Sequence, residues 1–434
     1  MIVLMKILQV LLALSILILI HELGHFVFAK MFRIRVEKFY LFFDAGFALF
    51  KFKPKNSDTE YGIGWLPLGG YCKISGMIDE SLDTEALKSE PKPWEFRSKP
   101  AWQRLLVMSG GVLFNFIFAI IVYIGIMAGW GESYISNEEN SIYVNELAYE
   151  MGFRNGDRIL KFDDYTPERF EMLQADMARQ TARKATVLRD GDTVNIYLDQ
   201  NRIGDVLNTP GMFDLAIPFV IDTVPPSSPN HDAGLSGGDR ITAIAGHPIE
   251  FLQDSRSLLA DCKGRTIDIT VVRDADTLQV PVQVDTAGRL GIYTSIPGVK
   301  TREYSVLSAV PAGIRHTFST IGGYVQDLKL IFTPSTEAYK SVGSFIAMGQ
   351  IFPEAWDWYR FLNILALLSI MLGVMNLIPI PALDGGHIVF TLYEMITGKK
   401  PSDKFLTAAQ MVGMVLLLGL MILAFGNDIG RLIR

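Results

Sequence analysis

Two histidines and a glutamate, His21, Glu22 and His25, form the pattern His-Glu-x-x-His near the start of the sequence. Residues four apart on a helix share one face, so the two imidazoles would lie one above the other with the carboxylate beside them. This arrangement lets a helix offer two nitrogen ligands to zinc and a base to the water that zinc activates. The residue types and their spacing therefore predict a hydrolytic zinc site.

The pattern lies inside an apolar run. Residues 7–20 before it are almost all apolar, and the first charged residue after Glu22 is Lys30. At a rise of about 1.5 Å per residue, His21 is roughly 13 Å from that end of the helix. The hydrocarbon core of a bilayer is about 30 Å thick, so we expect both histidines to lie within it. Burying ionisable groups there is energetically costly. A bound metal would compensate that cost, so metal binding is favoured over a purely structural role for the histidines.

The composition is that of an integral membrane protein. The chain has 434 residues, 49% of them apolar, and its mean hydropathy is +0.26. A net charge of −6 gives no support for nucleic-acid binding, so no nucleic acid is expected as a partner. The two cysteines, Cys72 and Cys262, are expected on opposite sides of the membrane, which excludes a disulfide between them within one chain.

Four segments are long and apolar enough to span a bilayer, at about residues 2–29, 105–130, 361–381 and 405–426. The first continues through the histidines and has no cleavage site, so we expect a retained helix and not a signal peptide. The loops at 30–104 and 399–404 are rich in Lys and Arg, which places them in the cytoplasm. The segment 131–359 and both termini then face outward.

The cytoplasmic loop contains a stretch of glycines and aromatic residues, Glu60–Tyr71. Its alternating side chains and turn residues predict a β-hairpin. The hairpin would either lie on the surface or dip into the membrane beside the histidines, and the pattern alone does not decide between these alternatives.

The outward segment contains an internal repeat. Residues 152–159 and 234–241 share the pattern Gly-hydrophobic-x-x-Gly-Asp-Arg-Ile, each followed by a polar helical stretch and by alternating apolar residues. The pair resembles tandem PDZ domains, which bind extended peptides by strand addition or act as steric filters. After the repeat, amphipathic helices are expected with breaks at Pro311 and Pro334, packed on the membrane surface or on the PDZ-like pair.

A zinc site with two histidines needs a further protein ligand, and Asp384 is the strongest candidate in an apolar setting. It closes the run Asn-Leu-Ile-Pro-Ile-Pro-Ala-Leu-Asp-Gly that begins at Asn376. Two prolines and two glycines interrupt the helix there, and such backbone is tolerated at membrane depth where it lines a cavity. The alternative is that Asp384 caps a turn before Gly385 and Gly386. His387 is expected at the cytoplasmic interface, outside the metal site.

The run ending at Asp384, combined with His-Glu-Leu-Gly-His in the first span, resembles the site-2 proteases, which are intramembrane zinc metalloproteases. Within them the chain is most similar to the bacterial RseP-type group with two PDZ domains. The similarity covers essentially the whole chain, including Gly-Trp-Leu-Pro-Leu-Gly-Gly-Tyr, Phe-Arg-Ser-Lys before the second span and Gly111-x-x-x-Asn115 within it. The chain departs from the family pattern at Gly343-Ser344-Phe345 and at Cys72.

The resemblance implies a role for each matching position. His21, His25 and Asp384 would bind Zn²⁺, and Glu22 would be the general base. The residues expected to contact substrate are Asn376, Gly62 and Gly64 of the hairpin, and Asn115.

The resemblance also implies the fold class: a polytopic α-helical membrane protein with four transmembrane helices, an inserted pair of PDZ-like α+β domains and a cytoplasmic, membrane-associated β-hairpin. The expected parts are the first span with the zinc motif (1–30), the cytoplasmic loop (31–100), the second span (101–130), the PDZ-like domains (131–205 and 206–298), the amphipathic region (299–358), the third span (359–398) and the fourth (404–426).

The implied activity is peptide hydrolysis inside the bacterial inner membrane. Substrates would be single-pass membrane proteins, such as anti-sigma factors, already shortened by an upstream site-1-type protease, and also signal-peptide remnants. The outward PDZ pair would exclude uncut substrates by size. The competing hypotheses are a non-catalytic membrane adaptor, for which Glu22 would have no use, and a zinc transporter, for which the second and fourth spans are too apolar.

Overall fold

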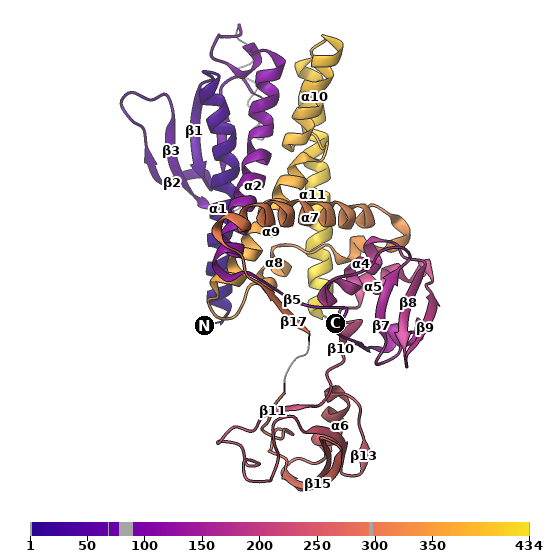
Figure 1. The fold of residues 1–434 in the computed structure, drawn as a ribbon. Coiled ribbons are helices and arrows are strands. Elements are labelled where there is room, and N and C mark those ends of the chain that lie inside the picture. The colour runs from indigo at the N-terminus through magenta and orange to yellow at the C-terminus, as the bar shows by residue number, and fades with distance from the viewer. Residues whose placement is uncertain (1, 68, 78–89, 295–297, 434) are drawn as a thin grey trace. The chain divides into compact units, whose positions relative to one another are not determined.

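The computed structural model describes residues 2–67, 69–77, 90–294 and 298–433. The chain divides into two compact units (Figure 1). The helical unit comprises residues 1–131, 303–332 and 339–434, and the β-rich unit comprises residues 132–302 and 333–338. The sequence also predicts a polar linker or surface helix over residues 81–100. Residues 81–89 lie outside the described residues, and the described part contains one 3-10 turn, η2 (Phe96–Ser98).

All four predicted spans are helices, and all are long and apolar enough to cross a membrane. They are α1 (Ile2–Met31), α2 (Ala101–Trp130), α9 (Trp358–Leu377) and α11 (Asp403–Ile433). The last extends beyond the expected end at residue 426. α9 ends earlier than expected, because Ile378 precedes Pro379 and takes an extended conformation.

A short non-helical loop separates α9 from α10 (Asp384–Thr397), which begins at the candidate aspartate. Ala382 in this loop has a φ of 125°, a strained conformation for a residue with a side chain. Gly413 of α11 holds the loop closely, since a Cβ there would lie 1.8 Å from the Pro381 carbonyl oxygen. At the far end of α10, Glu394 accepts a hydrogen bond from Arg104 of α2. α10 is thus held at its start by packing of the preceding loop on α11, and near its end by the hydrogen bond from α2.

Glycines bring α1 and α2 into backbone contact. A Cβ on Gly24 would lie 2.2 Å from the Gly110 carbonyl oxygen. Small residues permit such close approach between membrane helices, where burial of apolar surface gives no driving force.

The loop between α1 and α2 folds as a four-stranded sheet. Its strands are β1 (Val36–Leu41), β2 (Phe43–Phe52), β3 (Glu60–Leu66) and β4 (Tyr71–Ile74), in the order β2-β3-β1-β4. β3 pairs with β2 and with β1, whereas β4 pairs with β1. The predicted hairpin over Glu60–Tyr71 is therefore wrong: its two arms are separated by β1. Alternation identified the strands, but it carries no information about their partners.

The amphipathic region contains α7 (Val306–Ile331) and α8 (Phe345–Ile351). The break predicted at Pro311 is wrong, because the helix continues through it. Pro311 has no N–H to donate to the carbonyl oxygen of Leu307, so one backbone hydrogen bond is lost, and that bond lies close to the N-terminal end of the helix. The break at Pro334 is confirmed, where a single 3-10 turn, η6 (Pro334–Thr336), follows α7. Within the helical unit, α7 packs on α2 at Gly313, where a Cβ would lie 2.7 Å from Ile124.

The β-rich unit contains the two copies of the repeat. The first has α3 (Glu146–Glu150), β7 (Arg158–Phe162), α4 (Leu173–Arg179), β8 (Lys184–Arg189), β9 (Asp192–Tyr197) and α5 (Ile203–Asn208). The second has β12 (Arg240–Ile244), β13 (His247–Pro248), α6 (Ser255–Asp261), β14 (Thr266–Arg273) and β15 (Asp276–Gln283). The main sheets run β7-β8-β9 and β13-β12-β14-β15.

Two-stranded pairs complete the β-rich unit. They join β6 (Ile142–Val144) to β10 (Phe213–Leu215), β11 (Ile221–Thr223) to β16 (Tyr293–Thr294), and β5 (Glu132–Ile135) to β17 (Val299–Arg302). Because β10 pairs with β6, a strand beyond the expected boundary at residue 205 belongs with the first copy.

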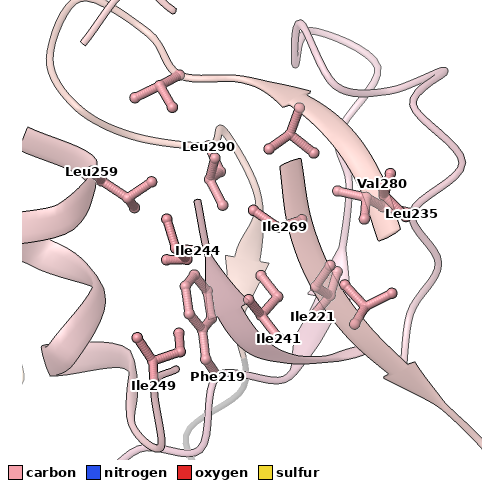
Figure 2. Packing of buried hydrophobic residues seen from close by; sticks show 13 residues of the cluster. Phe219, Ile221, Leu235, Ile241, Ile244, Ile249, Leu259, Ile269, Val280 and Leu290 are labelled. Atoms are coloured by element: carbon pink, nitrogen blue, oxygen red, sulfur yellow. The ribbon is translucent and has the colours of Figure 1, made fainter. Parts of the chain in front are cut away.

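The repeat extends to matching side-chain contacts. In the first copy, Arg189 donates two hydrogen bonds to the buried Asp157 and one to the Gly152 carbonyl oxygen. In the second, Arg273 does the same with Asp239 and Gly234. The core of the second copy is shown in Figure 2, where Phe219, Ile241, Ile244 and neighbouring aliphatic residues pack between the sheet and α6.

Candidate metal centre

Three potential ligands meet in the helical unit. His21 and His25 lie one turn apart on α1, and Asp384 is the first residue of α10. The Nε2 atoms of the two histidines are 3.3 Å apart, and each is 3.3 Å from Asp384 Oδ2. Residues far apart in the sequence are thus brought together as the sequence predicted, and their donor atoms face one point.

The spacing of these three atoms fits zinc. With bonds of about 2.0–2.2 Å to nitrogen and oxygen, tetrahedral coordination separates the ligand atoms by about 3.3–3.5 Å. Asp384 Oδ2 is buried and has no hydrogen-bond partner in the described part of the chain. Two imidazole nitrogens and a carboxylate oxygen at this spacing repel one another unless a cation or protons lie between them. The donor set therefore fits a divalent metal better than it fits a purely structural role.

Polar groups surround the outer edges of the two imidazoles. His25 Nδ1 lies 2.8 Å from the Val107 carbonyl oxygen, and His21 Nδ1 lies 3.1 Å from the side-chain amide of Asn115. Both partners belong to α2. Asn376 of α9 is placed differently, since its Nδ2 lies 3.4 Å from His21 Nε2, on the side of the three converging atoms.

A cavity of about 950 Å³ adjoins the three ligands, and Glu22 and Asn376 line it together with them. Cys72, the second residue of β4, lines the same cavity. The Glu22 carboxylate is thus beside the ligands and open to the same space. A cavity of this size can receive a peptide segment next to the base.

Two of the expected substrate-contacting residues are placed elsewhere. Gly62 and Gly64 lie in β3, which is paired on both edges, and they are not among the described residues lining the cavity. Their lack of a side chain serves packing within the sheet: a Cβ on Gly62 would lie 2.3 Å from the Tyr40 ring. The loop and its sheet reach the cavity through other residues, namely Lys38 of β1, Phe43 and Asp44 of β2, Pro67 and residues 69–74.

Asn115 was expected to contact substrate. It is fully buried on α2 and lies behind His21, outside the described lining of the cavity.

The structure brings further residues to the site that the sequence prediction missed. His387 lines the cavity, one turn after Asp384 on α10, and Gln410 of α11 lines the same cavity. The expectation that His387 faces the cytoplasmic interface stays a prediction. Its spacing of three from Asp384 was the available signal for a place beside the ligands.

Gly111 was noted only as part of a motif. A Cβ there would lie 2.5 Å from both His21 Cε1 and His25 Nε2, so the glycine makes room for the two rings.

A zinc-binding His-Glu-x-x-His motif on one membrane-spanning helix, facing an aspartate from another part of the chain, characterises a metalloprotease embedded in the membrane. Comparison with known proteins agrees, and the chain belongs to peptidase family M50, whose sequence model matches residues 9–420. The predicted resemblance to site-2 proteases is thereby confirmed.

Similar proteins are matched over nearly their whole length. The chain is 29% identical to a putative zinc metalloprotease of Neisseria meningitidis, over 97% of this chain and 98% of the relative. It is 28% identical to the regulator of sigma-E protease RseP of Escherichia coli, over 97% of both chains. A putative zinc metalloprotease of Borreliella burgdorferi is 29% identical over 99% of both.

Proposed function

We propose that this multi-pass membrane protein is an intramembrane zinc protease in which His21, His25 and Asp384 hold the metal. The observation that carries the proposal is the mutual 3.3 Å spacing of the three donor atoms beside a cavity lined by Glu22. The metalloprotease names of the relatives support zinc as the metal.

When bound here, zinc supplies Lewis acidity, which lowers the pKa of water and polarises a peptide carbonyl. Glu22 acts as general base, taking a proton from the attacking water and later giving it to the leaving amine. Asn376 is placed to donate its Nδ2–H to the oxygen of the scissile carbonyl, because it lies beside His21 Nε2 and lines the cavity.

The substrate must unwind before it is cut, because a helical amide is hydrogen-bonded and shielded. We infer that β4 offers the edge on which the unwound strand pairs. β4 stands at the end of the strand order β2-β3-β1-β4, and its residues line the cavity. Pairing there would replace backbone hydrogen bonds that the substrate loses inside the membrane.

The four-stranded sheet is proposed to dip into the membrane beside the site. Of the two alternatives that the sequence left open, this one is favoured by exposed apolar side chains on β2, namely Phe47, Leu49, Phe50 and Phe52. Such a patch is costly in water and favourable in lipid.

For the rest of the chain we propose the arrangement that the charge distribution and relatives favour. The two repeat copies are PDZ-like domains on the extracytoplasmic side of the bacterial inner membrane. Substrates are single-pass proteins shortened by an upstream protease, such as anti-sigma factors, and signal-peptide remnants. The sigma-E regulator among the relatives supports this substrate class. The PDZ-like pair excludes uncut substrates, so deleting residues 142–285 should allow intact substrates to be cut.

The test compares cells carrying the wild type with cells carrying Glu22→Gln, with the exposed Glu250→Gln as a matched control. Mass spectrometry of membranes should find single-span fragments that accumulate with Glu22→Gln alone, while purified Glu22→Gln retains zinc. Loss of the base should lower turnover by about 10²–10⁴-fold. Identical fragment profiles in all three strains, with zinc bound and substrates shortened outside, would instead favour a non-catalytic adaptor.

A further inference from the structure

We propose that Asn115 is a positioning residue that accepts a hydrogen bond from His21 Nδ1–H and so keeps His21 Nε2 free for the metal. The inference rests on the proposed zinc site. In this proposal Asn115 supports the metal ligand His21. The sequence analysis had instead predicted that Asn115 contacts the substrate.

The first step concerns the protonation of His21. Its Nε2 is the atom that lies 3.3 Å from both Asp384 Oδ2 and His25 Nε2, so Nε2 must present a lone pair to a metal. A neutral imidazole carries one N–H, which must then be on Nδ1. Whatever faces Nδ1 has to accept a hydrogen bond.

The same requirement holds for His25, and there the group that faces Nδ1 can only be an acceptor. Its Nδ1 lies 2.8 Å from the Val107 carbonyl oxygen, and a carbonyl can only accept. Val107, Gly111 and Asn115 follow one another at intervals of four on α2, so they form one stripe along that helix. The stripe consists of an acceptor for His25, a glycine that makes room for both rings, and a side chain that faces His21.

The second step concerns the orientation of the Asn115 amide. The Asn115 Nδ2 atom lies 3.1 Å from His21 Nδ1, and this orientation would place two N–H donors against each other. The oxygen and nitrogen of an amide occupy nearly equivalent positions, and their assignment follows from the hydrogen-bond network. Oδ1, which points away, is buried and has no partner in the described part of the chain. The contact with His21 therefore decides the orientation, with Oδ1 facing Nδ1.

The position of Asn115 fits support of a ligand and not contact with substrate. Its side chain is fully buried and lies behind the ring, whereas Asn376 lies beside Nε2 and lines the cavity. Acceptors behind a metal-bound histidine fix its tautomer and ring orientation, and their loss typically costs about 10–100-fold in metal affinity. Asn115 thus contacts the Nδ1 side of the His21 ring, and Asn376 contacts the Nε2 side.

The experiment uses the full-length protein purified in detergent and compares Asn115→Asp with Asn115→Leu. Aspartate keeps an acceptor oxygen at the same reach, whereas leucine has a similar shape and no acceptor. Competition with a chelator should show zinc binding weakened about 10–100-fold in Asn115→Leu and within a few-fold of wild type in Asn115→Asp. The absorption spectrum of the cobalt-substituted protein should change in the leucine variant and resemble wild type in the aspartate variant.

Three results would overturn the proposal. One is zinc binding by folded Asn115→Leu that equals wild type. Another is an equal loss in both variants, which would indicate a packing role. The third is a raised KM with unchanged zinc affinity, which would restore the substrate-binding role. If Asn115→Leu does not fold, Asn115→Ala replaces it, because it also lacks an acceptor. Zinc loss in His25→Ala tests the metal site separately, so failure of the proposed function would be recognised.

Discussion

Asp239 in the β-rich unit and Asp384 in the helical unit are both shielded from solvent, but their surroundings differ. Asp239 is fully buried and receives two hydrogen bonds from Arg273 and one from the Ser236 backbone N–H. Asp384 faces two imidazole nitrogens, and its Oδ2 has no hydrogen-bond partner in the described residues. A buried carboxylate whose oxygens all accept hydrogen bonds stabilises the fold. A carboxylate that faces other acceptors requires a cation between them.

The first copy of the repeat strengthens this contrast. Asp157 is also fully buried and is bound by Arg189 in the same way, with the Arg154 backbone N–H in place of that of Ser236. The same solution therefore occurs twice in one unit, at the turn that precedes a strand. Its repetition indicates a requirement of the local fold.

Removing the carboxylate charge at Asp384 should have the largest effect. In Asp384→Asn a neutral amide replaces the carboxylate, so zinc binding should be lost. Turnover should fall beyond the roughly 10²–10⁴-fold that loss of a general base alone causes. Zinc content measured by elemental analysis, together with cleavage of a single-span substrate, checks this expectation.

The matched control is Asp239→Asn, which should retain wild-type zinc content and turnover at permissive temperature. If Asp384→Asn bound zinc as tightly as wild type, Asp384 would be a turn cap and not a ligand. The contrast between the two aspartates would then fail.

Gly111→Ala sharpens the comparison without changing any charge. The added Cβ would lie 2.5 Å from His21 and His25 atoms, so one or both rings must move. A displacement of about 1 Å in a catalytic group can cost about 10²-fold in rate, and we expect a loss of that order together with weaker zinc binding. Gly125→Ala on the same helix has no atom within 4 Å of the new Cβ and should behave like wild type. Equal activity of the two variants would mean that the rings are not confined as described.

Local features were predictable from the sequence, whereas non-local ones were predictable only where two motifs could be combined. The four spans and the facing of His21 and His25 follow from hydropathy and from the period of one helix. The meeting of these residues with Asp384 came from combining two motifs at opposite ends of the chain. By contrast, the pairing of β3 with β2 and β1 depends on contacts that alternation does not encode.

The orientation of buried side chains was equally out of reach. Gly62 and Gly64 were expected at the substrate, but their spacing serves the packing of Tyr40 and Phe43 against β3. Asn115 was recognised as near the site, yet which side of His21 it faces depends on the crossing of α1 and α2. The continuation of α7 through Pro311 shows that a breaker near a helix start has less effect than one in the middle.

Asp239→Asn should affect stability and not chemistry. The amide keeps the shape but weakens the contacts with Arg273 and the Ser236 backbone, which is worth about 1–3 kcal/mol. Hydrogen exchange in the full-length protein should show faster opening of β12 and β14, with little change in β7 and β8 of the first copy. Equal acceleration in both copies would show that the two repeats unfold as one unit.

The smallest expected effect is a dependence on pH of the difference in stability between wild type and Asp239→Asn. Hydrogen bonds from Arg273 lower the pKa of Asp239 below its ordinary value, although burial opposes this. An unfolded aspartate titrates near pH 3.9, so the stabilisation is fully present above that pH and is lost as pH falls through the folded pKa. The stability of wild type should therefore approach that of Asp239→Asn as the pH is lowered below about 4, because wild-type Asp239 then becomes neutral as well. Hydrogen exchange of β14, corrected for the intrinsic effect of pH, measures this convergence. A constant difference down to about pH 2 would mean that the carboxylate charge does not stabilise the second copy.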